Sequence, residues 1–350
     1  MSKKKNNKSA LRSVLIVLCI VLGLVLAALI AGTVYAEYLL GKVNYTDPDA
    51  TVETLSQEDL DALYNETEPH DPDFVGPEYS EDEVFQETAP PMEEQSDNVI
   101  TILLLGMDRR GNETCRSDSI ILCTFNKTQN TITLTSLLRD MYVKIPGYKS
   151  NRINVPFALG GVPLLNETLR HNFGIETDGA VEIDFAHFKE LIDLLGGIEI
   201  ELSYAEANYV NQESGSRLDA GVQLLNGEQA LCYSRFRGTA TGDLARTNRQ
   251  RIVLTTLLNE YKSKSLPELL GLMDDILPMV TTNLSKDEIL NYVKDFFPML
   301  ATAEIVSQRI PVEGTYKQAK INGMAVVVFD VPDNADALQK TLSEYPEGVG

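Results

Sequence analysis

The feature that most constrains this chain is an uncharged apolar run of 23 residues, from Val14 to Ala36. At about 1.5 Å per helical residue, this run is long enough to cross a hydrocarbon core of about 30 Å. Five basic residues precede the run and almost none follow it directly, so the positive-inside rule predicts a cytoplasmic N-terminus. We therefore expect residues 1–13 in the cytoplasm, a single transmembrane helix over residues 14–36, and an extracytoplasmic remainder anchored to the plasma membrane.

A cleaved signal peptide is the alternative interpretation, because Val34-Tyr35-Ala36 is an acceptable cleavage site. The apolar run is longer than the roughly 15 residues that bound the apolar part of a signal peptide, which favours a retained anchor. Both interpretations place the bulk of the chain outside the cytoplasm.

The negative charge of the chain is concentrated in one segment. Of a formal net charge of −21, residues after Asp97 carry only −8, whereas the segment from Tyr45 to Asp97 holds 18 acidic side chains and no Lys or Arg. That segment also holds six prolines and few aliphatic residues, so it buries too little apolar surface to fold alone. We predict an acidic, Pro-containing linker over residues 37–97, mostly disordered, with one helical turn near residues 60–64, and a globular domain over residues 98–345.

Strand-like and helix-like runs alternate along this domain, which predicts an α/β fold with a sheet between helices. Apolar runs at residues 99–105, 119–125 and 131–137 indicate three strands. A helix capped by Asp184 should end at Gly196-Gly197, before a strand at 198–202. Further helices are expected within 266–300 and at 338–342, and late strands at 305–311 and 324–330.

Charged residues follow or precede each of the three early strands. If these strands pair in antiparallel order, the end of the first, the start of the second and the end of the third lie at one edge of the sheet. The charged residues at these points are Asp108, Arg110, Arg116, Asp118, Arg139 and Asp140. Solvated strand ends would explain any one of them. Their convergence from three segments favours a functional site.

The stretch from Arg235 to Arg251 holds five arginines in 17 residues. After a short helix at 224–231, we expect an extended segment that places Arg235 and Arg237 on one face. A helix over 243–263, with a buried stripe of Ile252, Leu254, Leu257, Leu258 and Tyr261, would align Asp243, Arg246, Arg249 and Gln250 in one row at its N-terminus. Free N–H groups and paired guanidinium donors both suit phosphate oxygens. The row predicts a phosphate or pyrophosphate ligand, with salt bridges to carboxylates as the alternative.

The cysteines give little guidance. Cys115, Cys123 and Cys232 lie outside the apolar run, so at most one disulfide can form within the chain. We interpret Cys123 and Cys232 as buried apolar residues, and a disulfide between them is the minor alternative.

From about Asn98 to Lys264 the chain resembles the LytR-CpsA-Psr family of cell-wall glycopolymer transferases. Seven ordered blocks carry the resemblance: LLLGMDRR (103–110), RSDSI (116–120), SLLRD (136–140), RIN with ALGG (152–161), DLLGGI (193–198), LNGEQALCYSRFR (225–237) and DLARTNRQ (243–250). The chain departs from the family at Leu138, where a proline is usual, and at Arg152, where a lysine is usual.

The resemblance implies an α-β-α domain with a central mixed sheet. It implies transfer of a glycopolymer, such as teichoic acid or capsule, from a polyprenyl-pyrophosphate carrier to peptidoglycan through a phosphodiester, in a Gram-positive bacterium. Asp108 and Asp118 would bind Mg²⁺, with Mn²⁺ as the alternative. Arg139, Arg152, Arg235, Arg237, Arg246 and Gln250 would contact pyrophosphate, and Arg110, Arg116, Arg249 and Asn154 would lie nearby.

Arg139, Asp140 and Arg246 are the expected catalytic groups, with Asp140 as a candidate base. The expected partners are the membrane, the lipid-linked glycopolymer and peptidoglycan, and no nucleic acid. Two other functions are also compatible with the sequence. One is a non-catalytic envelope regulator that binds lipid-linked polyanions, and the other is a polyprenyl-pyrophosphate hydrolase.

Overall fold

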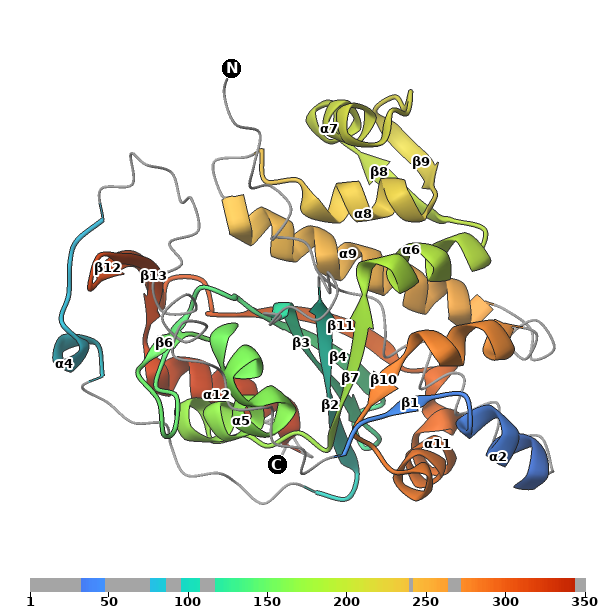
Figure 1. Cartoon of the computed structure of the whole chain (residues 1–350), viewed down its shortest axis with the longest axis horizontal. Coiled ribbons are helices and arrows are strands. Elements are labelled where there is room, and N and C mark those ends of the chain that lie inside the picture. The colour runs from blue at the N-terminus through green and yellow to red at the C-terminus, as the bar shows by residue number, and fades with distance from the viewer. Residues whose placement is uncertain are drawn as a thin grey trace.

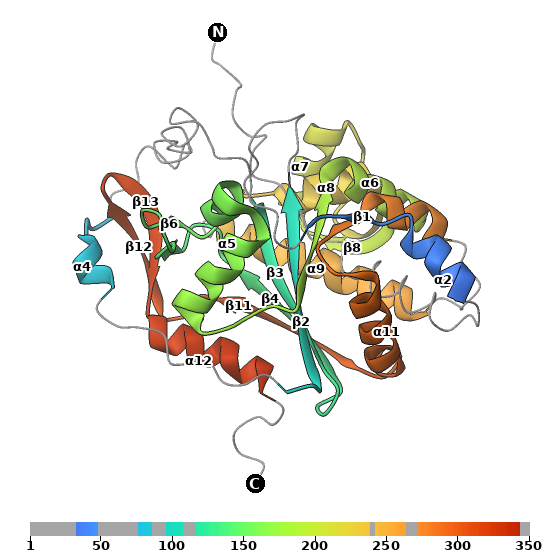
Figure 2. The ribbon, with the colours of Figure 1, turned by 60° about the horizontal axis from the view of Figure 1, so that its bottom comes forward.

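The computed structural model describes residues 33–47, 76–85, 96–107, 117–238, 242–263 and 272–343. Within them, a seven-stranded sheet lies between two layers of helices (Figures 1 and 2). The strand order is β1-β10-β7-β2-β3-β4-β11. The strands are β1 (Asn44–Tyr45), β2 (Val99–Met107), β3 (Ser117–Asn126), β4 (Thr131–Leu137), β7 (Gly179–Asp184), β10 (Thr281–Thr282) and β11 (Glu304–Ile310).

The centre of the sheet is the predicted antiparallel meander. β3 pairs in antiparallel register with β2 on one side and with β4 on the other. β7 joins β2 in parallel, and β11 joins β4 in parallel, which makes the sheet mixed. The meander, which was predicted from three apolar runs, is thus confirmed.

Apolar residues fill both faces of the sheet because successive strand residues point to opposite sides. Ile102 and Leu104 of β2 belong to one core cluster, whereas Leu103 and Leu105 belong to another. The first core is covered by α6 (Phe185–Leu194), α9 (Gly242–Ser263) and α11 (Lys286–Leu300), and the second by α5 (Val155–Phe173) and α12 (Val331–Leu342). A strand buried on both faces is largely apolar, and β2 is apolar except at Thr101.

Smaller elements surround the sandwich. β8 (Ile198–Leu202) pairs with β9 (Gly221–Leu225), and α7 (Tyr204–Ser214) and α8 (Gly227–Arg235) lie beside them. β5 (Tyr142–Val143) pairs with β6 (Asn151–Arg152), and β12 (Tyr316–Ile321) forms a hairpin with β13 (Met324–Phe329). A 3₁₀ turn, η1, spans Leu277–Met279.

Several predicted elements differ from the structure in their bounds. The helix expected at 224–231 begins only at Gly227 and runs to Arg235, because a capping box of Asn226 and Gln229 fixes its start. Arg235 is therefore helical, and the expected extended segment before it was wrong. Ile252 was expected in the buried stripe of α9 but is 38% exposed, and Val253 is buried there instead. The last helix, α12, begins at Val331 rather than at 338.

The N-terminal segment can be followed only from Thr33. Residues 14–32 of the expected membrane span lie outside the described residues, and α2 (Thr33–Leu40) includes its last four positions. No helix in the described part of the chain is long and apolar enough to cross a membrane. Leu39 and Leu40 are fully buried, and β1 pairs with β10, so this end of the expected linker packs against the domain.

A second segment of the expected linker, residues 76–85, also packs on the domain. It holds α4 (Glu81–Val84) and a β-bridge between Glu78 and Lys320. The Phe85 ring stacks on Tyr142 with 5.5 Å between centroids. The aromatic side chains of residues 76–85 make apolar contacts with the domain. The average composition of the linker did not predict these contacts. The helical turn expected at 60–64 lies outside the described residues.

Cys123 and Cys232 are both buried free thiols, so the alternative of a disulfide between them was wrong. Burial raises the pKa of Cys232 to about 11, which keeps its thiol protonated and unreactive at neutral pH.

Candidate active site

The start of β3 contains an irregularity at one of the predicted metal ligands. Gly106 pairs with Ser119 and Met107 pairs with Ser117, which leaves Asp118 as the extra residue of a β-bulge. Bulges are frequent beside active sites, where they change the direction of a side chain. Asp108, Arg110 and Arg116, predicted for the same edge, lie outside the described residues, and nothing is described of the side chain of Asp118.

The serines on either side of Asp118 are buried. The Ser117 and Ser119 hydroxyls have no hydrogen-bond partner among the described residues. Buried polar groups are rarely left without a partner, so such groups often mark a place for water, an ion or a ligand. Mg²⁺ usually keeps several bound waters, and the hydroxyl oxygens of Ser117 and Ser119 can accept hydrogen bonds from such waters. Within the described residues no group of three His, Cys, Asp or Glu side chains could hold a metal ion. The metal prediction therefore depends on Asp108 and Asp118.

The end of β4 leads into a buried ion cluster, which we call the Asp140 cluster: Arg139, Asp140 and Arg152. One oxygen of Asp140, Oδ1, lies 3.6 Å from Nε of Arg139 and 3.6 Å from Nε of Arg152. All three residues are at most 4% exposed. Two guanidinium groups thus meet at one carboxylate, and paired guanidinium donors suit the oxygen atoms of an anion.

Backbone contacts fix the cluster in place. Arg152 donates from Nε and Nη2 to the carbonyl of Ala325, at 3.2 and 2.9 Å. The carbonyl of Asp140 accepts from the amide of Val327 at 2.8 Å. The cluster is therefore attached to β13, and its guanidinium groups are positioned before any ligand arrives.

The motif after Arg152 places a helix N-terminus beside the cluster. Asn154 precedes α5 directly, is 2% exposed, and its Oδ1 atom has no hydrogen-bond partner in the described part of the chain. α5 is kinked at Gly160 and Gly161, and Gly161 has φ 63° and ψ −155°. Only glycine readily adopts this conformation, which explains the second glycine of the ALGG block.

Arg246, Arg249 and Gln250 of the predicted polar row on α9 are buried rather than solvated, and the side chain of Asp243 lies outside the described residues. Arg246 is 1% exposed and Gln250 is 3% exposed, and the Nε2 atom of Gln250 has no hydrogen-bond partner among the residues described. Leu244, two residues before Arg246, packs against the core cluster that contains Leu137 and Leu138, the residues just before Arg139. The start of α9 therefore lies at the same end of the sheet as the Asp140 cluster (Figure 1).

Arg249 is held by the protein itself, in an arrangement we call the Arg249 clamp: Arg249, Glu206 and Phe236. Its Nε donates to Glu206 at 2.5 Å and its Nη1 donates to the carbonyl of Phe236 at 2.9 Å. The guanidinium also lies over the Phe236 ring, 4.7 Å from its centroid. Here the alternative of a salt bridge to a carboxylate describes the contact, and Arg249 joins α9 to α7.

Burial by itself would raise the pKa of Glu206. Hydrogen bonds from Ser203 and from Arg249 outweigh that effect and lower the pKa below its usual value. Glu206 also completes the capping box of α7 with Ser203. One carboxylate thus stabilises both a helix start and the Arg249 clamp.

Arg235 and Arg237 lie where α8 ends. Arg235 is the last residue of α8, and its guanidinium lies 5.9 Å from the centroid of the Phe185 ring. α8 packs beside α9, so the RFR block adjoins the helix that carries Arg246. The structure keeps the predicted proximity of the two blocks, although it replaces the strand by a helix.

Arg251 was not among the predicted site residues, yet it is only 8% exposed. Its Nε donates to Ser307 of β11 at 2.9 Å and its Nη2 donates to Asn248 at 3.1 Å. Burial and the nearby charge of Arg309 lower the pKa of Arg251 to about 10. Arg251 directly follows the predicted site residue Gln250, which could have indicated a place in the site. It was left out because helical spacing puts it on a different side of α9 from the polar row.

The domain is thus a mixed α-β-α sandwich with buried arginines near one end of its sheet. The LytR_cpsA_psr family model matches residues 73–344, and the chain belongs to this family. The match begins before residue 98, in keeping with the packing of residues 76–85 on the domain.

Named relatives cover most of the domain. The chain is 30% identical over 258 residues to the regulatory protein MsrR of Staphylococcus aureus (strain COL), covering 71% of this chain and 76% of that protein. It is 32% identical over 220 residues to the polyisoprenyl-teichoic acid–peptidoglycan teichoic acid transferase TagU of Bacillus cereus, covering 61% and 69%.

Solved structures share the fold. TagT bound to LI-WTA superposes with a TM-score of 0.59 at 26% identity, covering 71% of this chain and 92% of that one. The LytR-CPS2A-psr family protein YwtF (TagT) with bound octaprenyl pyrophosphate lipid gives a TM-score of 0.55 at 25% identity, again over 71% and 92%. The predicted family and the mixed sheet between helices are confirmed.

Proposed function

We propose that this chain transfers a glycopolymer from a polyprenyl-pyrophosphate carrier to peptidoglycan, forming a phosphodiester. The observation that carries the proposal is the convergence of the Asp140 cluster, with its two buried guanidinium groups, and the buried Arg246 and Gln250 at one end of the sheet. The transferase name of TagU and the lipid pyrophosphate bound to TagT support the same ligand chemistry.

In this proposal the arginines bind and orient the diphosphate. Arg139 and Arg152, which Asp140 and β13 hold in place, would contact phosphate oxygens, and Arg246 would contact them from α9. Phosphoryl transfer depends mainly on positioning and on neutralising charge, which fixed guanidinium groups supply. Asp140 lies between two arginines, so we assign it a positioning role and leave proton acceptance as the second possibility.

Magnesium, or manganese in its place, belongs to the proposal through Asp108 and Asp118. When bound, such a cation neutralises charge on the phosphates. The buried hydroxyls of Ser117 and Ser119 fit this assignment because they supply oxygen atoms on both sides of Asp118. The membrane anchor and the extracytoplasmic site are further parts of the proposal, since the carrier lipid is itself in the membrane.

The experiment uses the full-length chain in detergent with Mg²⁺, a polyprenyl-pyrophosphate-linked glycan and peptidoglycan fragments. Coupled glycan on the fragments supports a transferase. Free phosphorylated glycan without coupling would indicate a hydrolase instead. Intact lipid after long incubation would contradict both the transferase and the hydrolase function. It would favour a non-catalytic regulator, as the name of MsrR suggests for that protein.

A further inference from the structure

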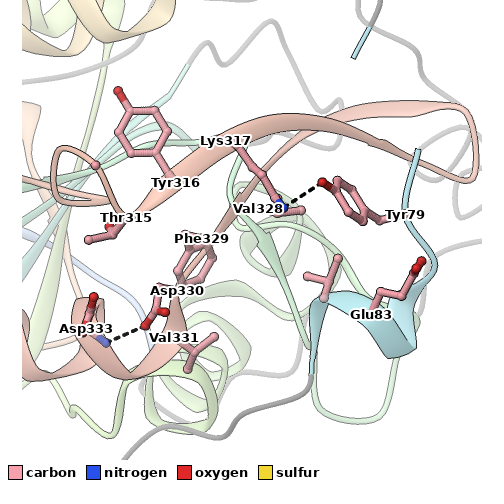
Figure 3. Close-up of a pocket in the computed structure, with 12 residues that line it drawn as sticks. Tyr79, Glu83, Thr315, Tyr316, Lys317, Val328, Phe329, Asp330, Val331 and Asp333 are labelled. Carbon is pink, nitrogen blue, oxygen red and sulfur yellow. Dashed lines mark hydrogen bonds between the residues drawn. The ribbon is translucent and has the colours of Figure 1, made fainter. Parts of the chain in front are cut away.

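A groove of about 420 Å³ lies between α4, the β12–β13 hairpin and the start of α12 (Figure 3). Tyr79 and Tyr316, both half-buried, contribute aromatic rings, and the buried Phe329 and Val328 form part of its floor. None of these residues belongs to the Asp140 cluster or to the α9 row. Tyrosine supplies both an apolar ring and a polar hydroxyl to a binding surface.

The charged groups of the groove are mostly acidic. Glu83, Asp330 and Asp333 are exposed carboxylates, and Lys317 is the cation among the lining residues. Asp330 accepts from the amide of Asp333 and caps α12, which keeps both side chains at the same edge of the groove. The groove is therefore net negative, and a phosphate-bearing polymer is disfavoured there by its charge.

One wall of the groove comes from residues 76–85, far from the rest in sequence. The Tyr79 amide donates to the Lys320 carbonyl at 2.9 Å, and the Lys320 amide donates to the Pro77 carbonyl at 2.8 Å. Lys317 Nζ donates to the Tyr79 hydroxyl at 2.7 Å and lies 4.2 Å from its ring centroid. The docking of this segment on β12 completes the groove.

The groove is connected to the Asp140 cluster by a single strand. Arg152 donates to the carbonyl of Ala325 in β13, and Phe329, four residues later in the same strand, lines the groove. Four strand residues span about 13 Å. A ligand a few sugar units long could thus reach from the groove toward the cluster.

We propose that this groove binds the glycan strand of the acceptor, as a neutral chain of N-acetylated sugars. The apolar C–H faces of sugar rings pack on aromatic rings, and sugar hydroxyls donate to carboxylates. Lys317 provides a donor for an acetamido carbonyl. The proposal rests on the proposed function, and it separates a cationic site for the anionic donor from an acidic groove for the neutral acceptor.

The test is calorimetric titration of the full-length chain with a tetramer of N-acetylglucosamine, which is uncharged and free of peptide. We expect Tyr316→Ala and Tyr79→Ala to weaken its affinity at least about tenfold, and Asp333→Asn to weaken it several-fold. Tyr204→Ala is the matched control, because Tyr204 lies on α7 outside the groove and is 76% exposed. The affinity of Tyr204→Ala for the sugar tetramer should match that of the unaltered chain.

Affinity for a short-chain prenyl pyrophosphate is measured on the same variants and should not change. Unaltered affinity of the groove variants for the sugar tetramer would overturn the proposal, as would equal losses in Tyr204→Ala. Tyr79→Ala could displace residues 76–85 and so weaken binding indirectly. Tyr316→Ala and Asp333→Asn alter residues outside that segment, so their affinities test the groove even in that case. The transfer assay judges the proposed function separately, since sugar binding in this experiment needs no donor lipid.

Discussion

The Asp140 cluster and the Arg249 clamp both bury arginines, but they use them differently. In the clamp, one guanidinium meets one carboxylate, one carbonyl and one ring, all from the protein. In the cluster, two guanidinium groups share one carboxylate oxygen at 3.6 Å. The first arrangement pairs one arginine with one carboxylate and joins helices, whereas the second places two arginines at one carboxylate beside a buried helix start. The residue type is the same, so the ratio of guanidinium to carboxylate groups distinguishes the two regions.

The largest effect is expected from Arg139→Ala. We expect transfer to fall by about 10²–10³-fold, because a fixed donor to the charged phosphates is lost. The measurement is the rate of coupling to peptidoglycan fragments at saturating donor. A rate within a fewfold of that of the unaltered chain would place Arg139 with the structural arginines and remove the contrast between the two regions.

Arg249→Ala should act on stability instead. Removing the arginine leaves Glu206 buried with Ser203 as its one side-chain donor among the described residues, which should cost about 3 kcal/mol of the free energy of unfolding. Urea denaturation measures this change. An undiminished free energy of unfolding combined with a loss of pyrophosphate binding would show that Arg249 contacts the ligand after all.

The clamp also predicts a pH dependence. The pKa of Glu206 is lowered in the folded chain, so its contribution to stability is present above its usual pKa of about 4.3 and is lost as the pH falls below it. Glu206→Gln should therefore lose less stability than the unaltered chain between pH 6 and pH 3.5. Parallel denaturation curves for the two proteins across this range would contradict the ionised clamp.

The smallest effect is expected where the expected linker docks. Tyr142 donates to Glu81 at 2.5 Å, and Tyr142→Phe removes this hydrogen bond while it keeps the stacking on Phe85. We expect a loss of about 1 kcal/mol in the free energy of unfolding, or faster proteolysis within residues 76–85. Lys317→Ala, which removes the contact with Tyr79, is the companion variant. If neither change has an effect, the contacts of this segment contribute nothing to stability.

The strands and helices were predictable where hydrophobic periodicity was strong. The meander from Val99 to Leu137, the α6 cap at Asp184 and the extent of α9 all followed from local pattern. The helix through Arg235 was missed because its apolar run also suits a strand, and a capping box at Asn226 decided between them.

The candidate site was predictable as a set of segments but not as a set of contacts. Sequence spacing brought the arginine blocks to one end of the sheet, whereas it could not show that Glu206, 43 positions before Arg249, would bind that arginine. Nor could composition show that residues 76–85 pack on β12, because that contact depends on a partner strand far along the chain. Both misses are tertiary pairings that local pattern does not encode.

Affinity for a prenyl pyrophosphate, measured by calorimetry, tests the central claim most directly. The comparison is between the affinities of two variants. Arg246→Ala changes the buried row of α9, and Glu206→Gln changes the Arg249 clamp. Because hydrogen bonds to charged groups contribute about 1.5–3 kcal/mol, Arg246→Ala should bind roughly tenfold to a hundredfold more weakly, and Glu206→Gln should bind as the unaltered chain does. Equal affinity of Arg246→Ala and the unaltered chain would contradict the placement of the anion site.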